Sequence, residues 1–519
     1  MKKTVFGIYT MIFILWVPLL MGQVSVPAAG LEAISSHEML AHVQFFASDE
    51  MMGRDTPSSQ LDSCAAFIAR YFRSMGMVPA ASLSNYFQPV PLLKTRLGGS
   101  QQFVLTVNGV TKEYALKDDF IPLPVSANRK VTAPLAFVGY SISAPEYQYD
   151  DYQGIDVRGK IVMAFTHEPQ ERDSASIFQG AKMTDHSELH NKVLNAIDHG
   201  AVGFIYVTDP AHKFRRPPNI WPSLMKTPPE EAIPFTLGEK EENKIVAVRI
   251  GKQLADDLMA VAGKRMEEIH HTIDKTLKPQ SFDVPQVSVT MAANLESDRF
   301  LTQNVVAWWP GSDPQLKQEI VVVGAHYDHL GARGDSAIFH GADDNASGTA
   351  GVMAVAKAFS RCPQRPLRSI VFMCFTGEEK GLFGSRYYAG TDPLFPLEKT
   401  VAMLNMDMIG RNDTTAVEVY GANRSPELAA ILKEVNSAIQ LKLDLKEDRR
   451  VGGSDHASFY RKKIPYLFFN TGTHDDYHRP SDTPEKLNAE KMAQIARLTF
   501  GCAWQIANMK NRPAPLTTD

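Results

Sequence analysis

Between residues 321 and 379, acidic and histidine side chains repeatedly follow apolar runs. Three such groups stand in this stretch, and they are His326-Tyr327-Asp328, Asp343-Asp344 and Glu378-Glu379. In α/β proteins the carboxyl ends of neighbouring strands meet at one edge of the sheet, where ligands and catalytic groups gather. Nitrogen and oxygen donors placed in this way are typical of zinc sites. The stretch therefore predicts an α/β hydrolase that uses two zinc ions.

Size and composition allow such a fold. The chain has 519 residues, more than one domain needs at about 100–200 residues each. Hydrophobic residues make up 44% and charged residues 22%, which permits a large core and argues against global disorder. A net charge of -4 gives no reason to expect a nucleic-acid partner. The four cysteines include no CxxC pair, so neither a disulfide framework nor a cysteine metal site is expected.

The N-terminus has the layout of a secretory signal peptide. Lys2 and Lys3 precede an almost wholly apolar run at residues 5–21, and small residues follow. The alternative is an uncleaved anchor, because the run is just short of the roughly 20 residues of a spanning helix. We expect a signal peptide at residues 1–22 and an exported protein, periplasmic or extracellular, with no other stable membrane partner.

Apolar runs alternate with helical patterns in the second half of the chain. Strands are expected at residues 304–309, 319–325, 369–375 and 401–406, and helices at 346–359 and 426–439. Strands alternating with helices of these lengths predict a doubly wound, mostly parallel sheet flanked by helices. This α/β domain is expected to comprise residues 23–125 and 280–519.

The intervening residues 126–279 have a different character. Short β-type runs at 159–165 and 204–207 flank a helical stretch at 191–199 that ends at Gly200. This pattern predicts a small β-rich domain with its own core. The segments DVRGKIV and AIDHGAVGFIYV resemble the protease-associated domain, an insertion found in several peptidase families.

The HxD group has two interpretations. His326 and Asp328 are two residues apart, so they point to the same side of an extended chain. Asp328 can then accept a hydrogen bond from a histidine that binds metal, which fixes its tautomer. An HxD alone is more typical of an ordinary polar pair at a strand end.

The two acidic pairs also leave alternatives open. A carboxylate at Asp343-Asp344, between two glycines, can bridge two cations, or the segment can cap the following helix. Glu378-Glu379 follow a buried strand, where two acids are costly unless a cation or a proton uses them. Neighbouring side chains at a strand end point different ways, so we expect one to bind metal and the other to hold a proton. A solvated turn is the alternative.

Two further positions are ambiguous by themselves. Asp407 ends the apolar run LNM and is as typical of a turn as of a metal site. His474 and His478 stand in the same polar loop after another apolar run, and sequence order alone does not separate them.

Five ordered motifs together resemble the secreted co-catalytic zinc aminopeptidases, the leucine-aminopeptidase-like family that also includes glutamate carboxypeptidase and the glutaminyl cyclases. These motifs are HYDHLG, GADDNASG, TGEEKGLFGS, NMDMIG and DYHRPSDT, and GGSDHASF resembles the family's substrate-side loop. The resemblance runs from about residue 34 to the C-terminus. It implies a zinc exopeptidase fold with an inserted protease-associated domain.

The resemblance also implies two zinc ions per chain and a role for each residue of the site. The implied set is His326 and Asp407 on one zinc, Glu379 and His478 on the other, Asp343 as the bridge, Glu378 as general base and Asp328 as the residue that orients His326. A cis peptide is implied between Asp343 and Asp344. His340 stands where relatives often have asparagine.

The implied reaction is hydrolysis of the first peptide bond of a peptide with a free N-terminus. A hydroxide bridged by two zincs would attack the carbonyl, and Glu378 would move the proton to the leaving amine. Three other functions stay open. A glutamate-carboxypeptidase-like exopeptidase would need arginines in its substrate pocket, a glutaminyl cyclase would use a single zinc, and an inactive binding ectodomain would have lost ligands that are present here.

Overall fold

The computed structural model describes residues 25–144, 147–173, 175–178, 180, 183–212, 235–238, 244–334, 337–447 and 451–516. The predicted signal peptide, residues 1–22, lies outside them. Across these described segments, every helix is too short or too polar to cross a membrane.

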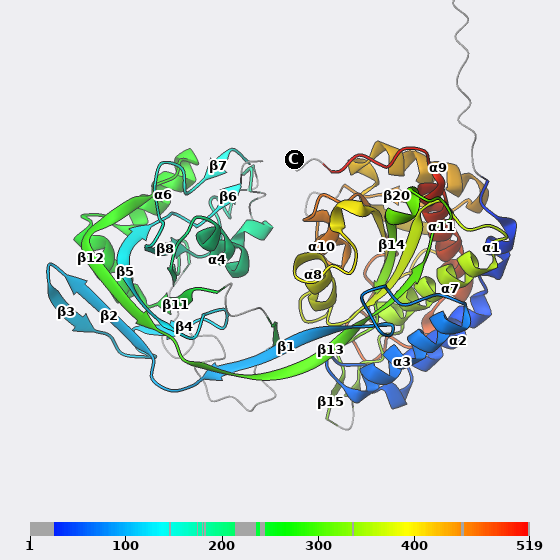
Figure 1. Cartoon of the computed structure of the whole chain (residues 1–519), viewed down its shortest axis with the longest axis horizontal. Coiled ribbons are helices and arrows are strands. Elements are labelled where there is room, and N and C mark those ends of the chain that lie inside the picture. The colour runs from blue at the N-terminus through cyan, green and yellow to red at the C-terminus, as the bar shows by residue number, and fades with distance from the viewer. Residues whose placement is uncertain are drawn as a thin grey trace, which may run out of the picture.

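Two lobes, each with its own sheet, are joined by a long two-stranded ribbon (Figure 1). The ribbon consists of β1 (Phe87–Leu97) and β13 (Leu295–Trp309), which pair antiparallel from Phe87 opposite Val305 to Leu97 opposite Leu295. The chain leaves the first lobe along β1 and returns along β13. The second lobe is therefore an insertion into the first.

The first lobe contains a nine-stranded sheet in the order β10-β1-β13-β17-β14-β18-β21-β19-β20. Its central strands run parallel, and they are β17 (Ser369–Phe375), β14 (Ile320–His326), β18 (Thr400–Met406) and β21 (Tyr466–Asn470). The edge strands are β10 (Phe235–Leu237) and β20 (Lys442–Leu445), and β19 (Ala416–Tyr420) lies between β20 and β21. The predicted α/β class is confirmed, but the sheet is mixed rather than mostly parallel. The ribbon to the second lobe adds antiparallel strands at one side, and β19 runs antiparallel to β21.

Helices cover both faces of this sheet because successive strand residues point to opposite sides. Val321 and Val323 pack into the core beneath one layer of helices, whereas Val322 packs into the core on the other face. The first layer consists of α1 (Ala28–Ala33), α2 (Ser36–Phe46), α3 (Ser59–Ser74), α7 (Gly348–Arg361), α9 (Pro426–Ile439) and α11 (Ala489–Asn508). The second layer includes α8 (Phe383–Gly390) and α10 (His456–Tyr460).

The second lobe contains an eight-stranded sheet in the order β3-β2-β12-β5-β8-β9-β11-β4. Its strands are β2 (Gln102–Val107), β3 (Val110–Glu113), β4 (Phe120–Pro122), β5 (Lys130–Phe137), β8 (Ile161–Phe165), β9 (Gly203–Val207), β11 (Val246–Ile250) and β12 (Phe282–Ala292). Its helices are α4 (Leu189–Asp198), α5 (Lys252–Val261) and α6 (Met266–Thr276).

The inserted lobe is larger than the predicted 126–279. It begins before β2 and ends after β12, because these two strands pair with each other and belong to the second sheet. Strands lie on both sides of the predicted start, with β4 before it and β5 after it, and β12 follows the predicted end, so the apolar pattern alone does not show where the chain changes sheets.

Candidate metal centre

Three parallel strands bring the acidic and histidine groups together. β14 ends at His326, β18 ends one residue before Asp407, and β17 leads into the turn that carries Glu378 and Glu379. His326 stands opposite Phe375, the last residue of β17. Neighbouring parallel strands therefore deliver these side chains to the same edge of the sheet, as the sequence predicts.

The first donor group consists of His326, Asp344 and Asp407. His326 Nε2 lies 3.3 Å from Asp407 Oδ1 and 3.4 Å from Asp344 Oδ1. All three side chains are buried, and neither His326 Nε2 nor Asp407 Oδ1 has a hydrogen-bond partner. Buried polar atoms without partners are costly, so a cation between them would stabilise the group.

The second donor group lies on the other side of Asp344. His478 Nε2 is 3.1 Å from Asp344 Oδ2 and 3.2 Å from Glu379 Oε2. The other oxygen of Glu379 lies 2.7 Å from His329 Nδ1. Asp344 therefore turns one oxygen toward each group, which is the arrangement of a carboxylate that bridges two cations.

The distances in both groups fit zinc. Zinc bonds of about 2.0–2.1 Å in a tetrahedral site place neighbouring ligand atoms roughly 3.3 Å apart. The four separations that join histidine nitrogens to carboxylate oxygens here run from 3.1 to 3.4 Å. Imidazole and carboxylate are also ligands that zinc accepts readily.

The position of the bridge corrects the sequence prediction. Asp344, not Asp343, lies between the two groups, and the cis peptide follows it, between Asp344 and Asn345. Asp343 points elsewhere, because its Oδ1 accepts the N–H of Gly410 at 2.7 Å and its Oδ2 lies 3.4 Å from His474 Nε2. Asp343 thus connects the loop of Asp344 to the loop that follows Asp407.

Hydrogen bonds from distant residues fix this register. The Asp482 carboxylate accepts the backbone N–H groups of Asp343 and Asp344. The Asn345 side chain donates to the carbonyl of Met406 and accepts the N–H of Gly348. The alternative that this segment caps the following helix is therefore also fulfilled, by Asn345.

Glu378 and Asp328 lie beside the first donor group. Glu378 Oε2 is 3.9 Å from His326 Nε2, and the Glu378 N–H donates to Asp328 Oδ1 at 3.1 Å. Burial raises the pKa of Glu378 well above its usual value; His326 opposes the rise, and nearby carboxylates such as Asp407 add to it. Asp328 Oδ1 lies 3.7 Å from His326 Nδ1, whose nearer acceptor is the Asp328 backbone carbonyl at 3.3 Å.

Comparison with known proteins shows what this part of the chain is similar to. Residues 304–502, which include every residue of both donor groups, match the model of peptidase family M28. We refer to residues 304–502 as the M28 domain, after the family model that they match, and to the two donor groups as the M28 centre.

Individual relatives match this region in part. A probable leucine aminopeptidase of Trichophyton verrucosum (strain HKI 0517) is 30% identical over 206 residues, 37% of this chain and 56% of that protein. Aminopeptidase YwaD of Bacillus subtilis (strain 168) is 26% identical over 202 residues, 38% of this chain and 43% of that protein. The chain thus spans about half the length of these relatives. Among solved structures, an aminopeptidase from Aneurinibacillus sp. strain AM-1 is 22% identical with a TM-score of 0.46, covering 95% of this chain and 97% of that one.

The structure separates His474 and His478, the two histidines of the loop after β21. His478 faces Asp344 and Glu379, whereas His474 faces Asp343 and lies outside both groups. His329 is a residue that sequence reasoning missed, although it stands directly after the HxD group. It is fully buried against Glu379, and its Nε2 has no hydrogen-bond partner.

Arg54, outside the M28 domain, is the second residue that sequence reasoning missed. Its guanidinium is buried and donates to the backbone carbonyls of Phe46, Tyr327, His340 and Gly341 at 2.6–3.0 Å. It therefore joins the end of α2 to the segment that follows His326 and to the segment that precedes Asp344. No spacing predicts this role, because carbonyl acceptors are present at every position of a chain.

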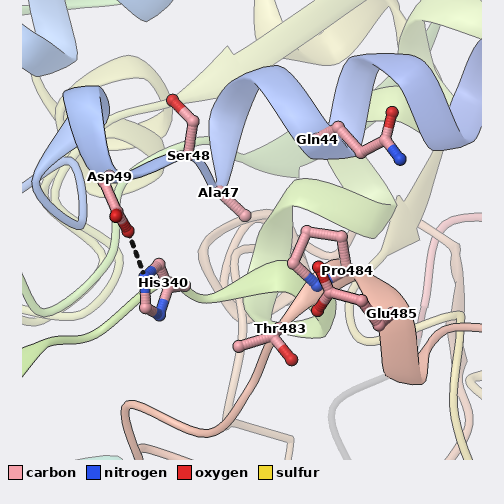
Figure 2. A pocket seen from close by; sticks show the side chains of 8 residues that line it. All are labelled: Gln44, Ala47, Ser48, Asp49, His340, Thr483, Pro484 and Glu485. Atoms are coloured by element: carbon pink, nitrogen blue, oxygen red, sulfur yellow. Dashed lines mark hydrogen bonds and ion pairs between the residues drawn. The ribbon is translucent and has the colours of Figure 1, made fainter.

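A surface hollow of about 290 Å³ lies at the C-terminal end of α2, and Figure 2 shows the side chains that line it. Its lining residues are Gln44, Ala47, Ser48, Asp49, His340, Thr483, Pro484 and Glu485. His340 Nε2 lies 2.9 Å from Asp49 Oδ1, and its backbone carbonyl accepts from Arg54. No residue of the two donor groups lines this hollow, so it is separate from the chemistry of the centre.

Proposed function

We propose that the protein is an exported zinc aminopeptidase that removes the N-terminal residue of peptides. The observation that carries the proposal is the position of Asp344, which turns one oxygen toward each of two donor groups, with Glu378 beside them. The match of residues 304–502 to peptidase family M28 supports the reaction class. The names of the partial relatives support the choice of aminopeptidase. Export rests on the signal-like pattern of residues 1–22.

Two zinc ions would share Asp344. His326 and Asp407 would complete the first site, and Glu379 and His478 the second. His329 would then hold the far oxygen of Glu379 through its Nδ1, which directs the nearer oxygen toward His478 and Asp344. When bound, zinc supplies a Lewis acid and allows water to act as a nucleophile at neutral pH.

Glu378 is the proton carrier in this proposal. Its side chain lies next to His326 without belonging to either donor group, so it is free to exchange a proton. Burial and the surrounding acids raise its pKa, which suits a group that accepts a proton from water and returns it to the leaving amine. The Glu378 N–H bond to Asp328 holds the turn beside the reacting atoms.

The experiment is a panel of aminoacyl chromogenic substrates, measured with and without a chelator. Free aminoacyl substrates should be cleaved, their N-acetylated counterparts should not, and the chelator should abolish cleavage until zinc is restored. Cleavage of the blocked substrates but not the free ones would overturn the proposal. Ammonia release from N-terminal glutamine without peptide cleavage would assign a glutaminyl cyclase instead.

A further inference from the structure

A second group of histidines and carboxylates lies in the inserted lobe, outside the M28 domain. His167 follows β8, and Asp209 and His212 follow β9, which is the parallel neighbour of β8. Glu171 stands in the same loop as His167. One nitrogen of each histidine and one oxygen of Glu171 all lie within 4.8 Å of one another.

The Asp209 carboxylate lies next to the Nδ1 atom of both imidazoles. Its buried carboxylate lies 2.6 Å from His167 Nδ1 and 3.0 Å from His212 Nδ1, and it accepts a further bond from Thr166 at 2.5 Å. A proton on each Nδ1 leaves the Nε2 lone pair of each ring free. The two rings also lie close together, with centroids 3.7 Å apart and their planes tilted by 30°. A carboxylate that fixes the tautomer of histidine in this way is typical of metal sites.

Glu171 completes the group. Its side chain is only 9% exposed, and its Oε1 lies 3.4 Å from His212 Nε2. Its Oε2 is buried without a hydrogen-bond partner, 3.8 Å from His167 Nδ1. The Arg172 guanidinium lies 3.5 Å from Glu171 Oε1, but its side chain is 73% exposed. A buried carboxylate oxygen without a partner is costly, and a cation would remove that cost.

We propose that His167, Glu171 and His212 bind a divalent transition-metal ion of the zinc type, with Asp209 as the positioning residue. Two imidazoles with one carboxylate favour zinc and its neighbours over calcium and magnesium, which take oxygen ligands. The 3.4 Å separation of His212 Nε2 and Glu171 Oε1 is close to the roughly 3.3 Å edge of a tetrahedral zinc site.

The site is open on one side. His167 and His212 are 29% and 32% exposed, so an ion can enter from solvent and keep a position for water. Three protein ligands with an open position are typical of zinc sites that exchange a ligand. None of these residues belongs to the M28 centre, so this inference does not depend on the proposed aminopeptidase activity.

The test counts zinc on the full chain. Chelator-stripped protein is dialysed against buffered Zn²⁺, and bound metal is measured by mass spectrometry. Wild type should hold one zinc more than Glu171→Gln, which keeps the size of the side chain, and one more than His212→Gln. His199→Gln is the matched control, because His199 lies in the same lobe but stacks on Tyr152 and contacts Asn195. It should keep the wild-type count.

Asp209→Asn provides the second arm. A positioning carboxylate should change affinity rather than stoichiometry, so this variant should bind the extra zinc about 10–100-fold more weakly. Circular dichroism checks that each variant is folded. Equal zinc counts in wild type, Glu171→Gln and His212→Gln, with unchanged affinity in Asp209→Asn, would overturn the proposal. That result would leave the group as imidazole–carboxylate ion pairs only.

Discussion

The M28 centre and the histidine group of the inserted lobe are built by the same topological rule. Each gathers side chains at the carboxyl ends of neighbouring parallel strands, β14, β17 and β18 in one lobe and β8 and β9 in the other. They differ in the solvent exposure of their side chains. His326, Asp344 and Asp407 are buried, whereas His167 and His212 are about a third exposed.

The supports differ as well. The backbone around Asp344 is held by three side chains, those of Arg54, Asp482 and Asn345. The histidine group of the inserted lobe is oriented by a single carboxylate, that of Asp209. The side chains of the first donor group are thus enclosed and held in place, and preorganised charges act more strongly away from solvent. The open group is suited to binding an ion that exchanges with solution.

The largest effect should come from separating the two adjacent aspartates of the M28 centre. Asp344→Asn removes the charge shared by both donor groups, so bound zinc should fall and peptidase activity should drop by several orders of magnitude. Asp343→Asn keeps an oxygen that can accept the Gly410 N–H, so it should cost only about 10–100-fold. The number of bound zinc ions and kcat/KM are measured for both variants and compared. A greater loss of zinc and of kcat/KM in Asp343→Asn than in Asp344→Asn would assign the bridging role to Asp343.

Glu378→Ala should separate proton transfer from metal binding at the same centre. Glu378 lies beside His326 but in neither donor group, so the variant should keep the zinc of the wild type. Turnover should fall by several orders of magnitude, because general acid–base catalysis alone supplies about 10²–10⁴-fold. Near wild-type turnover, or loss of the metal, would contradict the assignment.

Arg54→Met should show how much the buried support contributes. The variant leaves carbonyls of Phe46, Tyr327, His340 and Gly341 without their donor, so the free energy of unfolding should fall by about 3–5 kcal/mol. Urea unfolding measures this loss.

Arg70→Met on the exposed face of α3 is the control for the Arg54 variant, and it should change stability by less than about 0.5 kcal/mol. Equal stability of the two variants would show that Arg54 is not a structural link.

The sequence predicts much of this architecture because strand ends and helix patterns are local properties. The apolar runs locate β14, β17 and β18 to within about a residue, and the residues after them are those that meet. The register of Asp343 and Asp344 is not local. It depends on Asp482, which is 138 residues from Asp344, and no pattern within GADDNASG reveals that bond.

The same reason explains what the sequence did not predict in the second lobe. His167 and His212 belong to different strand ends, and only the pairing of β8 with β9 brings them together. The lobe boundary was misplaced because β2 and β12 look like any other strands until their partners are known. Long-range pairing, not residue type, carries this information.

The smallest effect concerns pH and the buried His456 of the first lobe. Burial lowers the pKa of His456 from 6.5 to about 3, and its Nδ1 has no hydrogen-bond partner. The folded state therefore keeps this ring neutral, while the unfolded chain takes up a proton below about pH 6.5. Stability from His456 is complete above pH 6.5 and is lost as pH falls toward 3, by about 1.4 kcal/mol per pH unit at most.

His456→Asn should remove this contribution. Its unfolding free energy, measured in urea between pH 7 and pH 5 with the tryptophan fluorescence that includes Trp504 in α11, should fall less steeply than that of wild type. The difference should reach about 1–2 kcal/mol over this interval. Parallel pH profiles would show that His456 takes up its proton without unfolding. Any loss of stability of the first lobe between pH 7 and pH 5 would then come from other titrating groups.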